Sequence, residues 1–242
     1  LPLNLGKDTF IAGTLRRADQ RDILFVDKSK ISKIKESQKI KILTSSPRRI
    51  YNIDSFVKNF FPFNCNQVEF LNIRGNIPTR FKKFLEGEGD ALIIAKAAID
   101  RLILNNLPEF ENLRLTIRKY IQMCNWIITP LSQNPSAPGQ GALGLEIRKN
   151  DIVLQKMIEK ISDPLDMKCV EHEREILQQY GGGCHQKIGV SFFPTFFGLM
   201  KSEKGETDSG KKLDSWEWYN KPKKNNRKTK INYIFPSNFE NR

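Results

Sequence analysis

The chain has 242 residues, enough for one large domain or two compact ones with a sizeable core. A hydrophobic content of 39% and a charged content of 28% are typical of a globular protein, which excludes a wholly disordered chain. The net charge of +13 indicates an anionic partner, such as nucleic acid, phosphate, a polycarboxylate or an anionic membrane surface.

The basic excess is uneven along the chain. Residues 221–230 hold six Lys or Arg and no acid, so the net charge overstates how basic the rest of the chain is. Four cysteines lie far apart and form no Cys-x-x-Cys pair: Cys65, Cys124, Cys169 and Cys184. Because the chain also has only two histidines, a zinc site is not expected. Sparse, unpaired cysteines favour a reducing compartment. No apolar run approaches the roughly 20 residues of a membrane helix, and no signal peptide opens the sequence. We expect a cytoplasmic protein.

The first half of the chain alternates between strand and helix patterns. Apolar runs predict strands over residues 9–15, 23–26, 40–44, 67–73 and 91–94. Helical spacing predicts helices over residues 47–60, from Thr79 onward, and from the end of the last strand through Arg101. This alternation implies right-handed crossovers and a mainly parallel sheet.

The second half has a different character. A Pro/Gly-rich turn opens residues 135–148 and leads into an apolar strand from Ala142 to Ile147. Helices are predicted over residues 151–161 and 164–179. Trp216, Trp218 and Tyr219 alternate as in an edge strand, although aromatic residues beside a basic run can also stack on nucleotide bases. Residues 231–236 have the pattern of a further strand.

Arginines gather at two strand-to-helix junctions, Thr44–Arg49 and Ile73–Arg80. Hydroxyl residues and Pro47 suit a helix start, which attracts anions, and Thr79 is the expected N-cap of the second helix. Since the carboxyl ends of neighbouring parallel strands share one crevice, four arginines are expected to converge on one anion site: Arg48, Arg49, Arg74 and Arg80. Taken alone, the first junction favours a simpler interpretation, a well-capped helix with a solvated basic turn.

Two further groups of arginines have simpler interpretations. Arg101 either joins the anion site or lies on the surface. Arg16, Arg17 and Arg21 are expected to pair with Asp19 and Asp22 on a surface turn.

Cys184 ends a run of three glycines, Gly181 to Gly183. Without Cβ atoms beside it, a bulky partner can approach the sulfur closely, and a thiolate is a strong nucleophile near neutral pH. On its own, the segment is a flexible hairpin with an incidental cysteine.

These segments, in this order, resemble the hydroxymethylbilane synthase family, also called porphobilinogen deaminases. The matching blocks are Arg17–Asp22, Thr44–Arg49, Arg74–Arg80, Leu85–Ala91, Ala137–Ala142 and the Gly-Gly-Cys loop, with Glu173-Arg174 where the family has Ala-Glu-Arg. Each block is weak alone, but six in the right order are a strong signal. The likeness covers about residues 1–200.

The resemblance implies both fold and chemistry. The cysteine of the loop, here Cys184, would carry a dipyrromethane cofactor through a thioether. The enzyme, a transferase of haem biosynthesis, deaminates porphobilinogen, couples four units head to tail on this primer and releases hydroxymethylbilane. Cofactor and substrate carboxylates would be held by Ser46, Arg48, Arg49, Arg74, Gly75, Arg80 and Arg101, with Gln140 lining the cleft. We further expect a monomer that binds neither nucleic acid nor membranes, and no metal.

The chain also departs from the family pattern. The family's catalytic aspartate lies in a Ser-Leu-Lys-Asp motif ahead of Leu1, so no catalytic residue is assigned, and Lys7-Asp8 is read as a coincidental match. Most of the family's first domain would be missing too. Pro47 replaces the usual leucine and removes one backbone N–H from the anion pocket.

We therefore expect an α/β protein with a middle domain of the periplasmic-binding-protein type II and a mainly parallel sheet, plus a small α+β domain. The expected division is an anion-binding domain over 1–130, a return crossover strand in 131–150, a cofactor-attachment domain over 151–215, and a basic linker or tail over 216–242. Two other functions remain open: a non-catalytic polyanion-binding module of the same fold, and a nucleic-acid binder driven by the basic tail.

Overall fold

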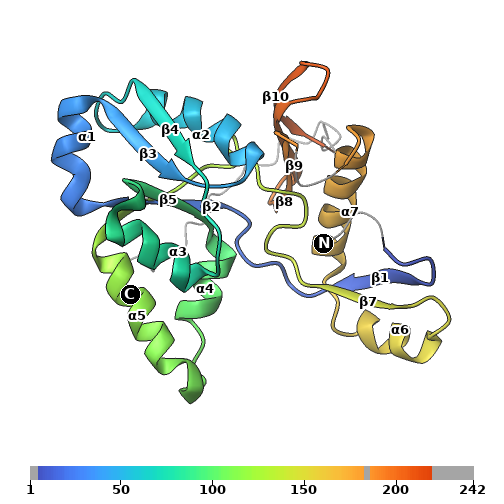
Figure 1. Ribbon diagram of the computed structural model, residues 1–242. Helices are drawn as coiled ribbons and strands as arrows, with labels where there is room; N and C mark the ends of the chain where they lie inside the picture. Colours follow the sequence, from blue (N-terminus) through green and yellow to red (C-terminus); the bar gives the residue numbers. More distant parts are fainter. Residues whose placement is uncertain (1–4, 183–185, 220–242) are drawn as a thin grey trace, which may run out of the picture.

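The computed structural model describes residues 5–182 and 186–219, and their strands form three separate sheets (Figure 1). The largest sheet has the order β4-β3-β5-β2-β6. Its strands are β2 (Asp22–Asp27), β3 (Lys39–Leu43), β4 (Gln67–Leu71), β5 (Ala91–Ala95) and β6 (Cys124–Ile128). β3 runs parallel to β4 and β5, whereas β2 is antiparallel to both β5 and β6. Four of the five strands thus share one direction, which confirms the mainly parallel α/β class.

Both faces of this sheet are covered by helices, because its central strands are apolar on both sides. In β2, Ile23 and Phe25 face one core, and Leu24 and Val26 face the other. The first core is completed by α3 (Ile77–Lys83), the π-helical turn Phe84–Glu88, α4 (Lys96–Ile103) and α5 (Glu111–Gln122). The second is completed by α1 (Ile31–Ser37) and α2 (Pro47–Phe60). Short 3-10 turns precede α1 at Lys28–Lys30 and α5 at Pro108–Phe110.

A smaller antiparallel sheet, β10-β9-β8, packs against α7 (Pro164–Gln179). Its strands are β8 (Gly189–Thr195), β9 (Gly198–Glu206) and β10 (Lys212–Trp218). Cys169 and Leu177 of α7 lie against Val190 and Phe192 of β8. This unit is the expected α+β part, and the aromatic run that ends at Trp218 forms an edge strand as predicted.

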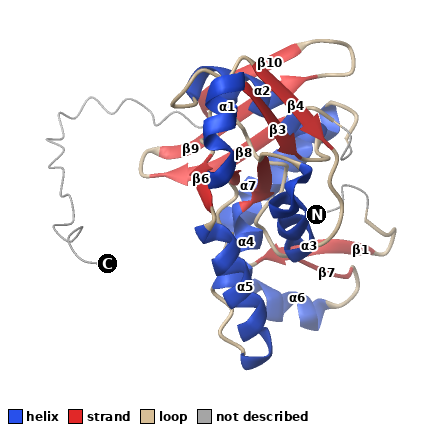
Figure 2. Cartoon of the chain, turned by 60° about the vertical axis from the view of Figure 1, so that its left-hand side comes forward, coloured by secondary structure: helices blue, strands red, loops and turns tan. Residues whose placement is uncertain are grey.

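The third sheet has only two strands, β1 (Thr9–Thr14) and β7 (Gly144–Arg148), which pair antiparallel with a bulge between Ile11 and Gly13. These strands come from distant parts of the sequence, and α6 (Ile152–Glu159) packs beside them (Figure 2). The chain therefore passes from β1 into the five-stranded sheet and returns through β7.

One helix start differs from its prediction. α3 begins at Ile77, and Asn76 is its N-cap: the Asn76 side-chain oxygen accepts a hydrogen bond from Thr79 N at 3.0 Å. Thr79 instead lies in the first turn, because Pro78 fits that turn without needing an N–H partner.

Candidate functional site

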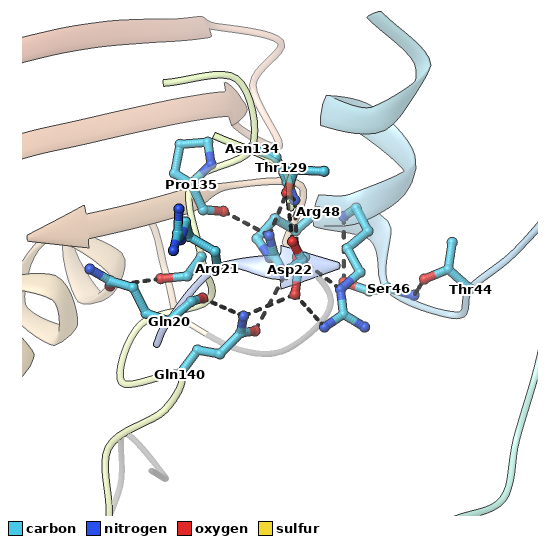
Figure 3. A network of polar contacts seen from close by, with 12 residues as sticks. Gln20, Arg21, Asp22, Thr44, Ser46, Arg48, Thr129, Asn134, Pro135 and Gln140 are labelled. Carbon is cyan, nitrogen blue, oxygen red and sulfur yellow. Dashed lines mark hydrogen bonds and ion pairs between the residues drawn. The ribbon is translucent and has the colours of Figure 1, made fainter. Parts of the chain in front are cut away.

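Asp22, the first residue of β2, is the centre of a buried polar network (Figure 3). Its Oδ2 accepts hydrogen bonds from Arg48 Nη2 at 2.8 Å, Arg49 Nε at 3.1 Å and Asn134 Nδ2 at 3.0 Å. Its Oδ1 accepts from Arg49 Nη2 at 2.7 Å and Gln140 Nε2 at 2.9 Å. One carboxylate thus binds the two arginines that open α2, and the trio keeps one net positive charge.

Arg48 is committed to contacts within the chain. Its side chain is 5% exposed, and its Nη1 donates to Asn134 Oδ1 at 3.0 Å and to the Pro135 carbonyl at 2.7 Å. Burial lowers the pKa of Arg48, while the Asp22 charge opposes this. Burial alone would raise the pKa of Asp22, but the charges of Arg48 and Arg49 outweigh it and hold that pKa well below its usual range.

Arg49 occupies a different position, because it reaches both Asp22 and an open pocket. Ser46 caps α2 and Pro47 follows in its first turn, so the local sequence fixes where these arginines emerge. The Nε and Nη2 of Arg49 bind Asp22, and within the described part of the chain Nη1 has no partner. Arg49 can therefore donate to an anion while it stays anchored.

The second junction brings Arg80 to the same pocket. Gly75 has a φ of +117°, which favours glycine, and a Cβ there would lie 2.9 Å from Thr79 Cγ2. In this conformation the Gly75 carbonyl accepts a hydrogen bond from Arg80 Nε at 2.7 Å. Burial and the neighbouring charge of Arg49 lower the pKa of Arg80. Among the described residues Arg80 has no carboxylate partner, so an anion between the two guanidiniums would relieve their repulsion.

The pocket has a cationic rim and apolar walls, with a volume of about 520 Å³. Its lining combines the 75–80 junction with residues of β5, α4 and α5: Arg49, Gly75, Asn76, Ile77, Pro78, Arg80, Ile94, Ala95, Ala98, Leu102 and Leu113. Such a lining suits a flat apolar ring that carries acidic groups.

The predicted site residues that the structure describes fall into three groups. Arg49, Gly75 and Arg80 line the pocket. Ser46, Arg48 and Gln140 lie in or beside the Asp22 network instead, shown in Figure 3. Arg74 and Arg101 are exposed and do not line the pocket, and Cys184 lies outside the described residues. Of the four arginines that were predicted to converge, only Arg49 and Arg80 line this pocket, whereas Arg48 is held by Asp22 and Arg74 is exposed.

The predicted surface turn around Arg17 is wrong in two of its pairings. Arg21 does bind Asp19, with Nη2 2.6 Å from Oδ2. Arg17, however, forms a buried two-pronged ion pair with Glu173 of α7, at 2.7 and 2.8 Å, and Asp22 pairs with the arginines of α2. Glu173 also accepts hydrogen bonds from the backbone N–H groups of Gly139 and Phe192, each at 2.7 Å.

Asp22 and Glu173 were thus missed as organising residues. A carboxylate directly before the buried run Ile23–Val26 was the available signal for Asp22, since a charge beside such a run needs a partner. For Glu173 the signal was its place on the buried side of a helix, between Cys169 and Leu177.

The three described cysteines are buried and poor nucleophiles: Cys65, Cys124 and Cys169. Burial raises the pKa of Cys124 and of Cys169 to about 12, and also raises the pKa of Cys65. A thiol with a raised pKa is protonated and unreactive near neutral pH.

The chain is an α/β protein with a pocket that contains two arginines beside its mainly parallel sheet. The family model for "Porphobilinogen deaminase, dipyromethane cofactor binding domain" matches residues 1–156. The chain therefore belongs to the porphobilinogen deaminase family.

Curated relatives agree with this assignment. The porphobilinogen deaminase of Chlorobaculum parvum is 32% identical over 201 residues, covering 83% of this chain and 56% of the relative. A probable porphobilinogen deaminase of Sulfurisphaera tokodaii is 34% identical over 165 residues, covering 67% of this chain and 47% of the relative. The chain spans about half the length of the curated relatives it matches.

Solved structures give only weak likenesses. One matching structure was described in a study of glutathione import via GshT in Streptococcus mutans. The match covers 71% of this chain and 63% of the chain in that structure, with a TM-score of 0.34 and 15% sequence identity. An arginine transport system periplasmic binding protein from Legionella pneumophila covers 72% and 65%, with a TM-score of 0.30 and 14% identity. Within residues 5–182 and 186–219, no helix has the length and apolar character to cross a membrane.

Proposed function

We propose that the protein acts as a hydroxymethylbilane synthase, which joins porphobilinogen units head to tail on a dipyrromethane primer bound to Cys184. The observation that carries this proposal is the pocket in which Arg49 and Arg80 face apolar walls. Porphobilinogen is a pyrrole ring with acetate and propionate side chains, so it matches that combination of charge and apolar surface.

The residues fit a dipyrromethane group on chemical grounds. Its four carboxylates need donors that the chain does not neutralise itself, and Arg80 and the Nη1 of Arg49 have no acidic partner among the described residues. Each charge-assisted hydrogen bond contributes about 1.5–3 kcal/mol. The bound group supplies the pyrrole carbon onto which new units are added.

The chain's own residues bind and orient the acidic groups. Arg49 stays fixed by Asp22 and donates through Nη1, while Arg80, held by the Gly75 carbonyl, donates from α3. Ile94, Ala98 and Leu102 exclude water from one face of the ring. Arg48 and Gln140 act through Asp22, which they help to hold. The proposal also includes contacts of Ser46, Arg74 and Arg101 with the carboxylates of the cofactor and substrate.

Arg80 provides the sharpest test of the pocket. Arg80→Leu should weaken porphobilinogen binding by roughly 10- to 100-fold, since it removes one charge-assisted contact. Calorimetric titration measures this, with Lys82→Leu as the matched control, because Lys82 lies on the same helix and only pairs weakly with exposed Glu86. Equal affinities for wild type and Arg80→Leu, or equal losses in both variants, would contradict the assigned pocket.

Cys184 is the remaining candidate for attachment, because the other three thiols are buried. We expect protein incubated with porphobilinogen to gain an adduct that maps to Cys184 by peptide mass spectrometry, and Cys184→Ser to gain none. An adduct on another cysteine would refute the attachment. Reversible binding with an unmodified Cys184 would favour the non-catalytic polyanion module.

A second measurement separates the thiols without any substrate. In folded, adduct-free protein, brief treatment with iodoacetamide at pH 7.5 should alkylate Cys184 and leave the other cysteines unmodified, since burial raises their pKa values. In denaturant all four should react. Early labelling of Cys124 or Cys169 in the folded protein would show that burial does not suppress the reactivity of these two thiols.

A further inference from the structure

The turn between β8 and β9 exposes two phenylalanines. Thr195 pairs with Gly198 across the two strands, so Phe196 and Phe197 form the tip of the hairpin. A two-residue tip usually holds Asn, Asp or Gly, because these residues fit its backbone conformation. Phe196 is 93% exposed and Phe197 is 48% exposed, so neither ring fills the core. Turn chemistry and core packing therefore do not account for this pair of rings.

The turn itself is held by hydrogen bonds, although its side chains are exposed. The Thr195 hydroxyl donates to the Gly198 carbonyl at 2.8 Å and accepts from Phe197 N at 3.2 Å. The centroids of the two phenyl rings are 5.2 Å apart, and the rings stand at 87° to each other. The hairpin therefore presents both rings to the solvent in a defined arrangement.

Two tryptophans of β10 extend this exposed aromatic surface. The Trp218 ring lies 6.3 Å from the Phe197 ring, and the Trp216 ring, which is 50% exposed, lies on the same side of β10. Glu217 points to the other side of the strand, where Lys201 Nζ binds it at 2.7 Å. A group of exposed aromatic residues marks an interaction site, whereas single exposed apolar residues are common. We call this group the aromatic tip: Phe196, Phe197, Trp216 and Trp218.

A strongly basic segment follows the aromatic tip along the chain. Tyr219 N donates to the Leu199 carbonyl at 2.9 Å, so β10 ends beside the first residues of β9. Residues 221–230 begin two positions after Tyr219 and hold six Lys or Arg and no acid. The covalent chain therefore tethers six positive charges to the end of the sheet that carries the aromatic tip.

Aromatic rings beside clustered cations match the two layers of an anionic membrane surface. Rings insert at the boundary between headgroups and acyl chains, while Lys and Arg bind the acidic headgroups. Stacking on nucleotide bases fits this geometry less well. Successive bases stack on rings that lie along a groove, whereas Phe196 and Phe197 project from a turn and stand at 87° to each other.

We propose that the aromatic tip and residues 221–230 together bind the surface of a membrane that contains anionic lipids. The contact is peripheral, and it departs from the expectation that the chain binds no membrane. It does not rest on the proposed function, so a failure of either one leaves the other standing.

Vesicle binding tests this inference without any catalytic readout. The full 242-residue chain should co-sediment with vesicles of phosphatidylcholine and phosphatidylserine, and it should bind less to vesicles of phosphatidylcholine alone. Potassium chloride should weaken binding, because salt screens the charges. Insertion should shift the tryptophan emission to shorter wavelengths, since Trp216 and Trp218 leave water. Trp126→Phe, which removes the third tryptophan of the chain, on β6, should keep this shift.

Paired variants make the test specific. Phe196→Ser/Phe197→Ser should weaken binding to the mixed vesicles by about 10-fold or more, since it removes two rings from the contact. The matched control is Leu104→Ser/Leu115→Ser, which removes two side chains that are 68% and 52% exposed elsewhere, and it should bind like the wild type. Replacing the six cations of residues 221–230 by Gln should remove the preference for phosphatidylserine. Circular dichroism and thermal unfolding check that each variant stays folded.

Four results would overturn the proposal. The first is no binding of the wild-type chain to the mixed vesicles. The second is vesicle binding that Phe196→Ser/Phe197→Ser leaves unchanged, or that both double variants lose equally. The third is binding to a single-stranded RNA oligonucleotide that needs the aromatic tip when vesicle binding does not. The fourth is self-association in place of vesicle binding, seen by sedimentation velocity and lost in Phe196→Ser/Phe197→Ser.

Discussion

Asp22→Asn should lower the free energy of unfolding by about 3–5 kcal/mol, because it leaves the guanidinium of Arg48 buried without a counter-charge. The asparagine keeps the shape of the side chain, so the loss reports the charge. Urea unfolding at pH 7 measures it. The control is Asp54→Asn, which removes a partner of Lys58 from an exposed pair and should cost less than about 1 kcal/mol.

The pH dependence of stability gives a second readout of Asp22. Two arginines hold the pKa of Asp22 below its unfolded value, so the folded state favours the ionised form. The resulting stabilisation is fully present above the unfolded pKa, near 4, and is lost as the pH falls below it. Below pH 4, the free energy of unfolding of the wild type should therefore fall more steeply with decreasing pH than that of Asp22→Asn. Parallel curves would show that Asp22 does not hold the arginines by charge.

Arg17→Ala should also destabilise the fold strongly, by about 3–5 kcal/mol at pH 7, because Glu173 is fully buried and would lose its only cationic partner in the described residues. Thermal or urea unfolding measures this loss. Arg21→Ala is the matched control, since its ion pair with Asp19 is partly exposed and should contribute less than about 1 kcal/mol.

Acid should partly rescue Arg17→Ala. Burial raises the pKa of Glu173, and in the wild type Arg17 opposes that rise. The variant lacks the Arg17 charge, so the pKa of Glu173 in the folded state lies further above its value in the unfolded state. The folded state then binds more protons, and stability increases as the pH falls through the folded pKa toward the unfolded one. A variant that is no more stable at pH 5 than at pH 7 would contradict this account of Glu173.

Helix α2 shows what local sequence can determine. The predicted helix over residues 47–60 coincides with Pro47–Phe60, because the cap Ser46, the proline in the first turn and the apolar spacing all indicate the same bounds. The two cores on either side of β2 and β5 could also be predicted, because both strands are continuous apolar runs.

Long-range pairing was not visible in the same way. Asp22 meets arginines 26 and 27 residues away and Asn134 at a separation of 112 residues, and no local pattern encodes such distances. The sequence also predicted no element for α5 and β6. In β6 residues Asn125 to Ile127 are exposed, so the strand lacks the alternation that would have revealed it. The N-cap Asn76, by contrast, could have been predicted from the sequence, because asparagine is as common at this position as the threonine that was chosen.

The anchoring of Arg49 by Asp22 has a consequence for selectivity. A free arginine side chain loses roughly 2 kcal/mol of rotamer entropy when a ligand immobilises it. Arg49 has already lost that freedom on folding, so under the proposed function an incoming carboxylate would meet a rigid donor edge at a set angle. An acid whose carboxylate cannot reach that angle while its ring lies on the apolar wall would gain nothing from Arg49. The proposed pocket would then discriminate among small acids by geometry more than by charge.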